Sequence, residues 1–596
     1  MNLLHRLSAP LAIVTFGTLL AACAQPRSAP EAASTEPVRL RVIAFNDFHG
    51  NLEAATLNLF LADPAKPGTT VRTALGGAAA LAGTVTALRA GAPYSVVLSG
   101  GDMIGASPLA SSLFRHESTI EVMNRLGVDV AAPGNHEFDG GQAELLRIVR
   151  GGCAPNLADA PTTSCTLQPY TGAKFAVVAA NIETAPGSTL FPPFVVKQYG
   201  PVKVGFIGAT TRTTPSIVSP TGVAGLSFLD EAESINRAAA ALKVQGVNTI
   251  IVTMHEGGEI GTPEKAADWN DTSCPNFRGE LVDINARLSA DVDLVMSAHT
   301  HQGYRCIVGG RPLMSAVSYG RGVSVADLLI DPRSGKVDSA RTLTRNLPVF
   351  NERSDAAVRE RISAAEPPTF AQALRQAVPS PEIAERVAAY AALAAPRATR
   401  EVGRIGGSFD RNGRSDTSAG RLIADAQLAA TRDPARGGAQ LSLMNPGGVR
   451  SDLACRGTPP CVVTYGDTFT MQPFGNGLVV MTLSGAELKA VLEQQRPENR
   501  NSAALLNPSA GLRYRWLAKA PEGSRVADLT LDGRPVLPGS DYRVVVNSFM
   551  ADGGDGFTVL RSGRQRLGGP PDLDALVDFL KTGPSPTATA RVEWVE

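Results

Sequence analysis

Short apolar runs alternate with amphipathic stretches through the first half of the chain. The runs are rich in Val, Ile and Ala and almost continuous in apolar character, which is typical of strands covered on both faces. Seven runs have this character: residues 40–45, 95–98, 128–132, 175–180, 202–207, 249–253 and 293–296. Helical stretches lie between them, at residues 78–89, 120–126 and 231–245. The pattern predicts an α/β domain with a layered sheet.

The pattern changes beyond the last of these runs. Residues 352–400 are rich in Ala, Glu and Arg, prolines interrupt them, and a helix is expected at 383–395. Further on, we expect helices at 419–431 and 485–495, and strands at 440–443, 478–483, 525–531 and 542–547. The chain therefore divides into a first domain at 38–348, a helical connector at 349–400 and a mixed α/β domain at 401–596.

The N-terminus has the character of a bacterial targeting segment. A mostly apolar stretch at residues 7–20 leads to Leu20-Ala21-Ala22-Cys23, which resembles a lipobox. We expect residues 1–23 to be a lipoprotein signal with Cys23 as the lipidation site, and residues 24–37 to be a disordered tether. The alternative is plain secretory cleavage with an incidental cysteine. The expected location is the cell envelope, on the periplasmic side or at the outer membrane, with the lipid anchor in the membrane.

Composition narrows the possible partners. A chain of 596 residues is too long for one compact core, so two or more domains are expected. Lys plus Arg and Asp plus Glu both number 56, and this balance gives no reason to expect a nucleic-acid polymer as partner.

The cysteines support export. Without Cys23, six of the seven remain, and they lie in neighbouring pairs along the chain. In an oxidising compartment we expect the pairs Cys153 with Cys165, Cys274 with Cys306, and Cys455 with Cys461. Free thiols and other connectivities stay open alternatives.

Five of the seven histidines lie in clusters with acids and amides, and each cluster follows an apolar run. Side chains just past strand ends converge on one edge of an α/β sheet. Imidazoles, carboxylates and an amide oxygen suit divalent transition metals, and the set suffices for two sites roughly 3.5–4 Å apart. The alternative is a group of buried histidines satisfied by the backbone. The candidate ligands are Asp47, His49, Asp102, Asn135, His255, His299 and His301.

Two further side chains near these clusters are not expected to be ligands. His116 precedes a helix start, where we expect it to be exposed. Glu137 is expected to be a structural hydrogen-bond partner.

The order Asp-x-His, Gly-Asp, Gly-Asn-His-Glu, His and His-x-His resembles the calcineurin-like metallophosphoesterase superfamily. The runs Asn46-Asp47-Phe48-His49-Gly50 and Gly134-Asn135-His136-Glu137-Phe138-Asp139 are similar to the bacterial 5′-nucleotidase/UDP-sugar hydrolase family. The resemblance implies a four-layered α/β/β/α first domain and two divalent ions, Zn, Mn, Co or a mixture. It implies that one ion binds Asp47, His49, Asp102 and His301, and that the other binds Asp102, Asn135, His255 and His299. His136 and Asp139 match the catalytic pair of the family.

The chain departs from the family pattern near its last two ligands. Ser297-Ala298 stands where relatives often have a glycine, and His301 stands where some relatives have glutamine. Either side chain can bind a metal ion, so the second change affects metal preference rather than metal binding.

The second domain carries glycine-rich runs with aromatic residues. Arg450 offers a planar fork for a phosphate or a carboxylate, and Gly448 lets a ligand approach the backbone. By resemblance, Phe474 and Phe549 clamp a nucleobase, Asn476 contacts its edge and Asp555 binds ribose. The remaining candidates for ribose or phosphate are Asn445, Arg450, and one or both of Arg411 and Arg414.

These motifs together predict an exported, monomeric phosphohydrolase that removes the 5′-phosphate from nucleotides, and that also cleaves nucleotide diphosphates and UDP-sugars. Closure of the second domain over the first is implied. Alternatives on the same scaffold are a 2′,3′-cyclic nucleotide phosphodiesterase/3′-nucleotidase, a dinucleotide (NAD) pyrophosphatase and a sulfur-compound hydrolase. A non-enzymatic surface binding lipoprotein is the remote alternative.

Overall fold

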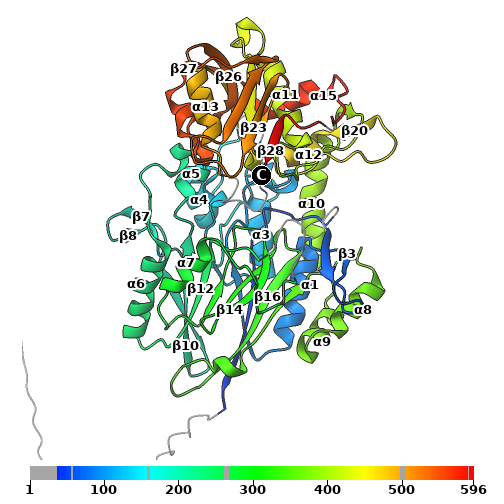
Figure 1. Ribbon diagram of the computed structural model, residues 1–596. Helices are drawn as coiled ribbons and strands as arrows, with labels where there is room; N and C mark the ends of the chain where they lie inside the picture. Colours follow the sequence, from blue (N-terminus) through cyan, green and yellow to red (C-terminus); the bar gives the residue numbers. More distant parts are fainter. Residues whose placement is uncertain (1–35, 55–57, 157–161, 261–267, 497–504, 588) are drawn as a thin grey trace, which may run out of the picture.

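The computed structural model describes residues 36–596 except 55–57, 157–161, 261–267, 497–504 and 588. The expected lipoprotein signal, Cys23 and most of the tether lie outside these described residues. Figure 1 shows two bodies joined by a long helix, α10 (Pro381–Ala398), which runs from the first body to the second. None of the described helices is long and apolar enough to cross a membrane.

Two six-stranded sheets form the centre of the first domain. The first has the order β17 (Leu343–Pro348), β16 (Gly322–Ile330), β1 (Val38–Phe45), β4 (Tyr94–Ser99), β5 (Val130–Ala131), β6 (Ala176–Val177). The second has the order β14 (Gly303–Val308), β15 (Arg311–Ala316), β13 (Leu294–Met296), β12 (Thr249–His255), β10 (Val202–Thr210), β9 (Phe194–Tyr199). Their inner strands are parallel, so the ends that carry the site lie at one edge.

The sheets pack face to face, and helices cover both outer faces. Alternate residues of β1 separate the two environments: Leu40 and Val42 meet Phe206 of the second sheet, whereas Ile43 faces the helices. The outer face of the first sheet is covered by α1 (Ala78–Ala90), α3 (Glu117–Leu126), α9 (Pro368–Gln376) and α10. The outer face of the second sheet is covered by α6 (Glu231–Val244) and α7 (Glu280–Arg287). The expected α/β/β/α layering is confirmed.

Several short elements complete the domain and its connector. They are α2 (Leu109–Ser112), α4 (Gly141–Arg150), α5 (Thr214–Ile217), α8 (Ala356–Ala364), β2 (Asn58–Ala62), β3 (Thr70–Ala74), β7 (Ile182–Ala185), β8 (Ser188–Thr189) and β11 (Ser227–Phe228).

Two expected strands are shorter than predicted. The run at 128–132 is strand only at Val130–Ala131, because Pro133 follows and has no amide hydrogen to donate. The run at 175–180 is strand only at Ala176–Val177. Its next residues leave the first sheet, and Ala180 donates its amide to Gly208 of β10 in the second sheet. These residues are apolar because they cross between the sheets.

The connector helix α10 is fixed to the first domain. Ser380 caps it by accepting a hydrogen bond from the amide of Ile383, and Pro381 occupies its first turn. Glu121 of α3 holds its middle: Arg386 lies 2.6 Å away and the Tyr390 hydroxyl donates to it at 2.8 Å. The C-terminal part of α10 contacts α12 (Tyr465–Met471) of the second domain.

The second domain is built on a five-stranded sheet of order β22 (Asn507–Pro508), β19 (Leu441–Met444), β26 (Asp541–Asn547), β21 (Gly477–Ser484), β27 (Arg564–Pro571). One smaller sheet pairs β18 (Glu401–Ile405) with β20 (Cys461–Thr464). The other has four strands in the order β25 (Arg534–Pro535), β24 (Val526–Leu531), β23 (Leu512–Leu517), β28 (Val592–Val595). Its helices include α11 (Ser418–Thr431), α13 (Gly485–Glu493), α14 (Ser548–Ala551) and α15 (Asp572–Leu580). Both helices and all four strands predicted here are confirmed.

The six described cysteines form three disulfides. They join Cys153 to Cys165, Cys274 to Cys306, and Cys455 to Cys461, as the sequence predicts. Each bridge lies within one domain.

Candidate active site

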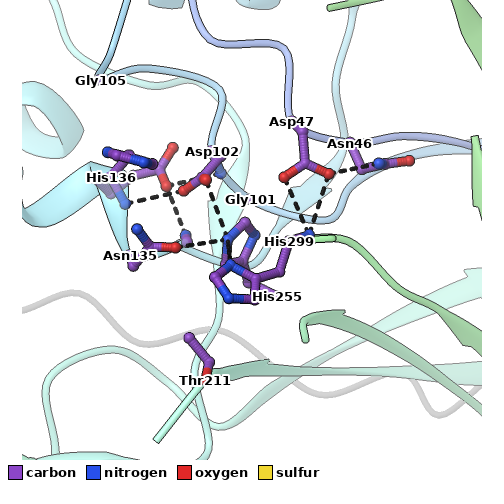
Figure 2. Close-up of polar contacts among 12 residues, drawn as sticks. Asn46, Asp47, Gly101, Asp102, Gly105, Asn135, His136, Thr211, His255 and His299 are labelled. Atoms are coloured by element: carbon purple, nitrogen blue, oxygen red, sulfur yellow. Dashed lines mark hydrogen bonds and ion pairs between the residues drawn. The ribbon is translucent and has the colours of Figure 1, made fainter. Parts of the chain in front are cut away.

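The first group of candidate ligands gathers where strands of both sheets end, and Figure 2 shows its members Asp47 and Asp102. Asp47 and His49 follow β1, and His301 comes from the loop after β13. His49 Nε2 lies 3.1 Å from His301 Nε2 and 3.5 Å from Asp102 Oδ2, and His301 Nε2 lies 3.5 Å from Asp47 Oδ1. The four donors that the family resemblance assigns to one metal ion therefore lie together.

The second group lies beside the first. His255 ends β12, and its Nε2 lies 3.0 Å from Asn135 Oδ1, 3.2 Å from His299 Nδ1 and 3.1 Å from Asp102 Oδ2. Asp102 Oδ2 is thus close to one imidazole of each group, whereas Asp102 Oδ1 accepts the amide of His136 at 2.9 Å. A single carboxylate oxygen is shared by the two groups.

Backbone carbonyls fix the tautomers of two imidazoles. His49 Nδ1 donates to Gly105 O at 2.9 Å, and His255 Nδ1 donates to Gly100 O at 3.0 Å. Each Nε2 therefore points toward the neighbouring donors, and in the neutral ring it carries the lone pair that can bind a metal ion. This is how histidine ligands of metal ions are oriented.

The donor set fits divalent ions in size and in charge. Neighbouring nitrogen ligands of a tetrahedral zinc ion lie about 3.3 Å apart, close to the separations here. Burial lowers the pKa of His299 to about 3 and the pKa of His301 well below its usual value, which leaves both imidazoles neutral. Burial also opposes a charge on His255, but Asp102 outweighs it and raises the pKa of His255 to about 10. The pocket therefore favours positive charge between His255 and Asp102.

Left-handed backbone is concentrated at the ligands. The φ angles are 48° at Asp47, 47° at His49, 49° at Asp102, 71° at His299 and 56° at His301. Side chains rarely adopt this region, and each such residue costs on the order of 1–3 kcal/mol. The surrounding hydrogen bonds hold these loops in place.

Two buried side chains supply many of those bonds. Asn46 Nδ2 donates to Asp47 Oδ2 at 2.6 Å, and Asn46 Oδ1 accepts the amide of Ala316 at 3.0 Å. Glu137 accepts the amides of Asp102 at 2.9 Å and Gly134 at 2.6 Å. Glu137 therefore has the hydrogen-bonding role expected for it, and Asn46 is a support that the sequence did not single out.

His136 and Asp139 form a pair next to the shared carboxylate. Their closest atoms, His136 Nδ1 and Asp139 Oδ2, are 2.9 Å apart. Burial opposes a charge on His136, but Asp139 and Asp102 outweigh it and raise the pKa of His136. An imidazolium here can stabilise negative charge on a bound phosphoryl group.

The expectation that His116 is exposed is wrong. Its side chain is half-buried behind this pair, and its Nδ1 lies 3.0 Å from Ser111 Oγ. Burial lowers the pKa of His116 to about 4.

The second domain reaches this centre through Phe474 and Arg450. The Phe474 ring stacks on the His136 ring at 5.7 Å and 17°, and the Arg450 guanidinium lies 5.8 Å from the Phe474 centroid. The charge of Arg450 contributes to the low pKa values of His49, His299 and His301. Arg450 Nε is buried without a hydrogen-bond partner, so the guanidinium can still donate to a ligand.

The other candidate nucleoside residues lie in one hydrogen-bonded group in the second domain. Asn445 Nδ2 donates to Asp555 Oδ2 at 2.8 Å, and the Ser548 hydroxyl donates to Asn476 Oδ1 at 3.3 Å. Phe549 is half-buried and packs on Gly554, and Gly448 is buried against Asn445. The segment Gly554–Gly556 contacts α5 of the first domain, so this group also lies at the domain interface.

The two candidate arginines point in different directions. Arg411 donates to the carbonyl of Arg450 and so lies next to the centre. Arg414 pairs with Glu596 at 2.5 Å and lies over the Trp594 ring. The geometry therefore favours Arg411, and Arg414 is not brought to the site.

The sequence analysis did not single out Tyr319 and Arg321, which also lie at the centre. The Tyr319 ring lies 5.4 Å from the His301 ring and 5.8 Å from the His49 ring, and the Arg321 guanidinium lies 5.2 Å from the Tyr319 centroid. The run Tyr319-Gly320-Arg321-Gly322 combines an aromatic residue, glycines and an arginine. The same combination identified candidates in the second domain and could have identified these two.

Comparison with known proteins agrees with this two-domain site. A family model described as calcineurin-like phosphoesterase matches residues 40–303, and one described as the 5′-nucleotidase C-terminal domain matches residues 396–562. The chain belongs to the 5′-nucleotidase family of metallophosphoesterases. It is therefore a metal-dependent phosphoric ester hydrolase, and the calcineurin-like fold implies divalent metal ions as its cofactors.

Individual known proteins resemble the chain along most of its length. A probable 5′-nucleotidase of Treponema pallidum is 28% identical over 594 residues, which cover 91% of each protein. Endonuclease YhcR of Bacillus subtilis is 29% identical across 94% of this chain, which spans 41% of the length of that protein. The crystal structure of a 5′-nucleotidase precursor from Thermus thermophilus is 26% identical with a TM-score of 0.71, covering 94% of this chain and 99% of that one.

Proposed function

We propose that the protein is an exported two-metal phosphohydrolase that releases phosphate and a nucleoside from 5′-nucleotides. The observation that carries this proposal is the contact of Phe474 with His136. It brings an aromatic side chain of the second domain, suited to stacking on a base, next to a centre suited to phosphate.

Each group of residues at the centre has its own role in the reaction. Two divalent ions held by the seven ligands would lower the pKa of a water molecule and polarise the phosphoryl oxygens. His136 is oriented by Asp139, and the N–H group of its ring donates a hydrogen bond to the phosphoryl group or to the leaving oxygen. Arg450 offers its fork to the same phosphate. A covalent phospho-enzyme is not required.

The nucleoside is assigned to the second domain. Phe474 and Phe549 supply aromatic faces for the base, and Asn476 lies close to both segments. Asp555, which accepts a hydrogen bond from Asn445, is assigned to the ribose hydroxyls. Substrate entry and product release then require the second domain to move away from the centre.

The location, the metals and the assembly state extend the proposal. Three disulfides are consistent with an oxidising compartment, and Cys23 is proposed as the lipid anchor at the cell envelope. The imidazole-rich ligand set favours Zn, Mn or Co over magnesium. We expect the protein to act as a monomer.

A phosphate-release panel tests the proposal. Purified protein with Mn²⁺, Zn²⁺ or Co²⁺ is given AMP, ATP, UDP-glucose, 2′,3′-cyclic AMP and NAD, with His136→Ala as the control. Phosphate release from AMP that is lost in His136→Ala supports the proposal. Activity confined to the cyclic nucleotide or to NAD would replace it with one of the two alternatives, and inactivity on every nucleotide would refute it.

A further inference from the structure

The side chain of Asn547 is buried at the centre of the second domain. Asn547 ends β26, the middle strand of the five-stranded sheet, and immediately precedes α14. Its Oδ1 accepts the amide of Met550 at 2.9 Å and so caps α14. A backbone amide can only donate, so this bond fixes which end of the Asn547 side-chain amide is the oxygen. The Nδ2 group is therefore the donor on the other side.

The Nδ2 group of Asn547 meets Asn445. It donates to Asn445 Oδ1 at 3.0 Å and lies 3.6 Å from Met444 Sδ, a weak acceptor. Because Asn445 Oδ1 accepts this bond, Asn445 Nδ2 faces Asp555, and it donates to Asp555 Oδ2 at 2.8 Å. The opposite orientation of Asn445 would place a carbonyl oxygen against a carboxylate oxygen. The capping bond of Asn547 thus determines, through Asn445, which group faces the carboxylate.

The carboxylate of Asp555 stands on a turn that needs such a support. The φ angle of Asp555 is 57°, and glycines stand on both sides of it, at Gly554 and Gly556. Glycine-rich backbone has many alternative conformations, so the carboxylate keeps one place only where partners hold it. The bond from Asn445 joins this turn to the residue that follows β19.

The packing around Asn445 keeps its acceptor in place. Asn445 and Asn547 are both buried, and a Cβ atom at Gly448 would lie 2.9 Å from Asn445 Oδ1. Leu443 and Val546, next to these two strand ends, belong to an apolar cluster. A polar relay is costly in such surroundings unless its members are satisfied, and apolar side chains would fill the same space. The relay therefore has a purpose other than packing.

The residues that follow Asn547 reach the rest of the nucleoside group. The Ser548 hydroxyl donates to Asn476 Oδ1 at 3.3 Å, and Phe549 comes next in the chain. Three consecutive residues thus connect to the side chains assigned to the ribose, to the edge of the base and to its face. Asn547 serves the ribose part of this group.

We propose that Asn547 is a positioning residue for the sugar of the substrate: through Asn445 it holds the Asp555 carboxylate where that group accepts hydrogen bonds from both hydroxyls of a ribose. The site then prefers ribonucleotides to 2′-deoxyribonucleotides, because the deoxy sugar lacks one of the donors to this charge. This inference rests on the proposed function and specifies the sugar of its substrates.

The test compares kcat/KM for AMP and 2′-deoxy-AMP in the metal-loaded full chain. The wild type is expected to favour AMP on the order of 10- to 100-fold, the effect of one hydrogen bond to a charged group. Asn547→Ser keeps an oxygen to cap α14, but its side chain is too short to reach Asn445. The preference should therefore fall about tenfold, through a higher KM for AMP with kcat nearly unchanged.

The matched control is Asn124→Ser in the first domain. Asn124 also accepts one backbone amide, from Lys174, and donates to one backbone carbonyl, that of Gly172. It has no link to Asn445 or Asp555, so the preference for AMP should stay that of the wild type. Loss of the preference in this control as well would overturn the inference.

A binding measurement gives a readout that does not depend on turnover. Calorimetry of the metal-loaded protein compares adenosine with 2′-deoxyadenosine. The wild type should bind adenosine about tenfold more tightly or better, and Asn547→Ser should remove most of this difference. If Asn547→Ser does not fold, the same affinity ratio in Asn547→Thr decides, since threonine also caps α14 and fills more of the space.

The outcomes separate this inference from the proposed function. Equal losses for AMP and 2′-deoxy-AMP in Asn547→Ser, or a wild type that binds both nucleosides equally, would overturn the inference and leave the proposed function standing. Inactivity of the wild type on both nucleotides would overturn the proposed function, and the two nucleoside affinities would still decide the role of Asn547.

Discussion

At the residue scale, the metal centre and the catalytic pair have separate supports. A backbone carbonyl fixes His255, so that its Nε2 faces Asp102 and Asn135. A carboxylate fixes His136 instead, through Asp139. Substitution of His255 should therefore affect metal binding, whereas substitution of His136 should affect catalysis alone.

His136→Ala should lower kcat by roughly 10²- to 10⁴-fold, because general acid–base help from a positioned side chain is of that size. Its metal content should remain that of the wild type, because His136 Nδ1 is held by Asp139. His255→Ala is the matched comparison and should lose bound metal as well as activity. Metal analysis of both variants, together with phosphate release, checks the assignment. Loss of metal from His136→Ala would identify His136 as a ligand.

At the element scale, a buried ion pair joins four elements of the first domain. Arg41 of β1 pairs with Asp327 of β16 at 2.6 Å, donates to the Leu88 carbonyl of α1 and contacts the Thr369 hydroxyl of the connector helix α9. Arg41 is completely buried, so its charge depends on this carboxylate. The pair therefore holds the connector against the sheet.

Asp327→Asn should lower the free energy of unfolding by about 3–5 kcal/mol, because it leaves the Arg41 charge buried without its partner. Urea unfolding of the metal-free protein measures the change. Asp338→Asn, which breaks the exposed pair with Arg341, should have no measurable effect. Equal stability of the two variants would show that Arg41 finds another partner.

The first turn of α15 contains a carboxyl group that makes stability depend on pH. Burial raises the pKa of Asp572 from 3.8 to about 7. Between these values the folded protein binds more protons than the unfolded chain, so the free energy of unfolding falls as pH rises from about 4 to 7. Above pH 7 this carboxyl group no longer changes the free energy of unfolding.

Asp572→Asn should remove this dependence, which is on the order of 4 kcal/mol. Unfolding measured by tryptophan fluorescence at several pH values checks it, since Trp516 and Trp594 lie in the same domain. A wild-type curve parallel to that of the variant from pH 4 to 7 would contradict the shift.

The parts of the fold that could be predicted from the sequence are those whose apolar pattern is uninterrupted. β1 and β12 could be predicted as buried strands because their residues face two hydrophobic layers. β16 was not predicted, because Ser324 and Asp327 interrupt its pattern. Both are buried, and their partners Asn346 and Arg41 are distant in the sequence. Polar groups satisfied by distant partners carry no local pattern.

The same limit applies to the site. The seven candidate ligands could be predicted because scarce residue types follow apolar runs at fixed spacings. Tyr319 and Arg321 could not be placed, because their position depends on the fold of the loop between β15 and β16. The choice between Arg411 and Arg414 likewise needed the structure, since both follow the same strand.

At the scale of the whole molecule, a short helix of the first domain seats the second. Leu109 of α2 is buried in the apolar cluster of the second domain, among Val402, Ile405 and Tyr465. The same helix contacts α10, whose middle is fixed to Glu121. The closed arrangement thus depends on apolar contact at α2 as well as on the stacking of Phe474 on His136.

Leu109→Asp should favour an open arrangement, because a carboxylate cannot be buried among these side chains without a partner. Small-angle scattering should show a larger radius of gyration, and KM should rise about tenfold or more while metal content stays the same. Leu393→Asp, at an exposed position of α10, is the matched control. An unchanged scattering profile would show that α2 does not seat the second domain.

The left-handed backbone at the ligands affects which substitutions persist during evolution. The residues concerned are Asp47, His49, Asp102, His299 and His301. Replacement of one of these residues by glycine relieves backbone strain and removes a costly buried polar group. A mutation that destroys activity can therefore leave the metal-free fold intact or improve it. Selection for folding alone erodes these five positions over generations, and only selection for turnover preserves them.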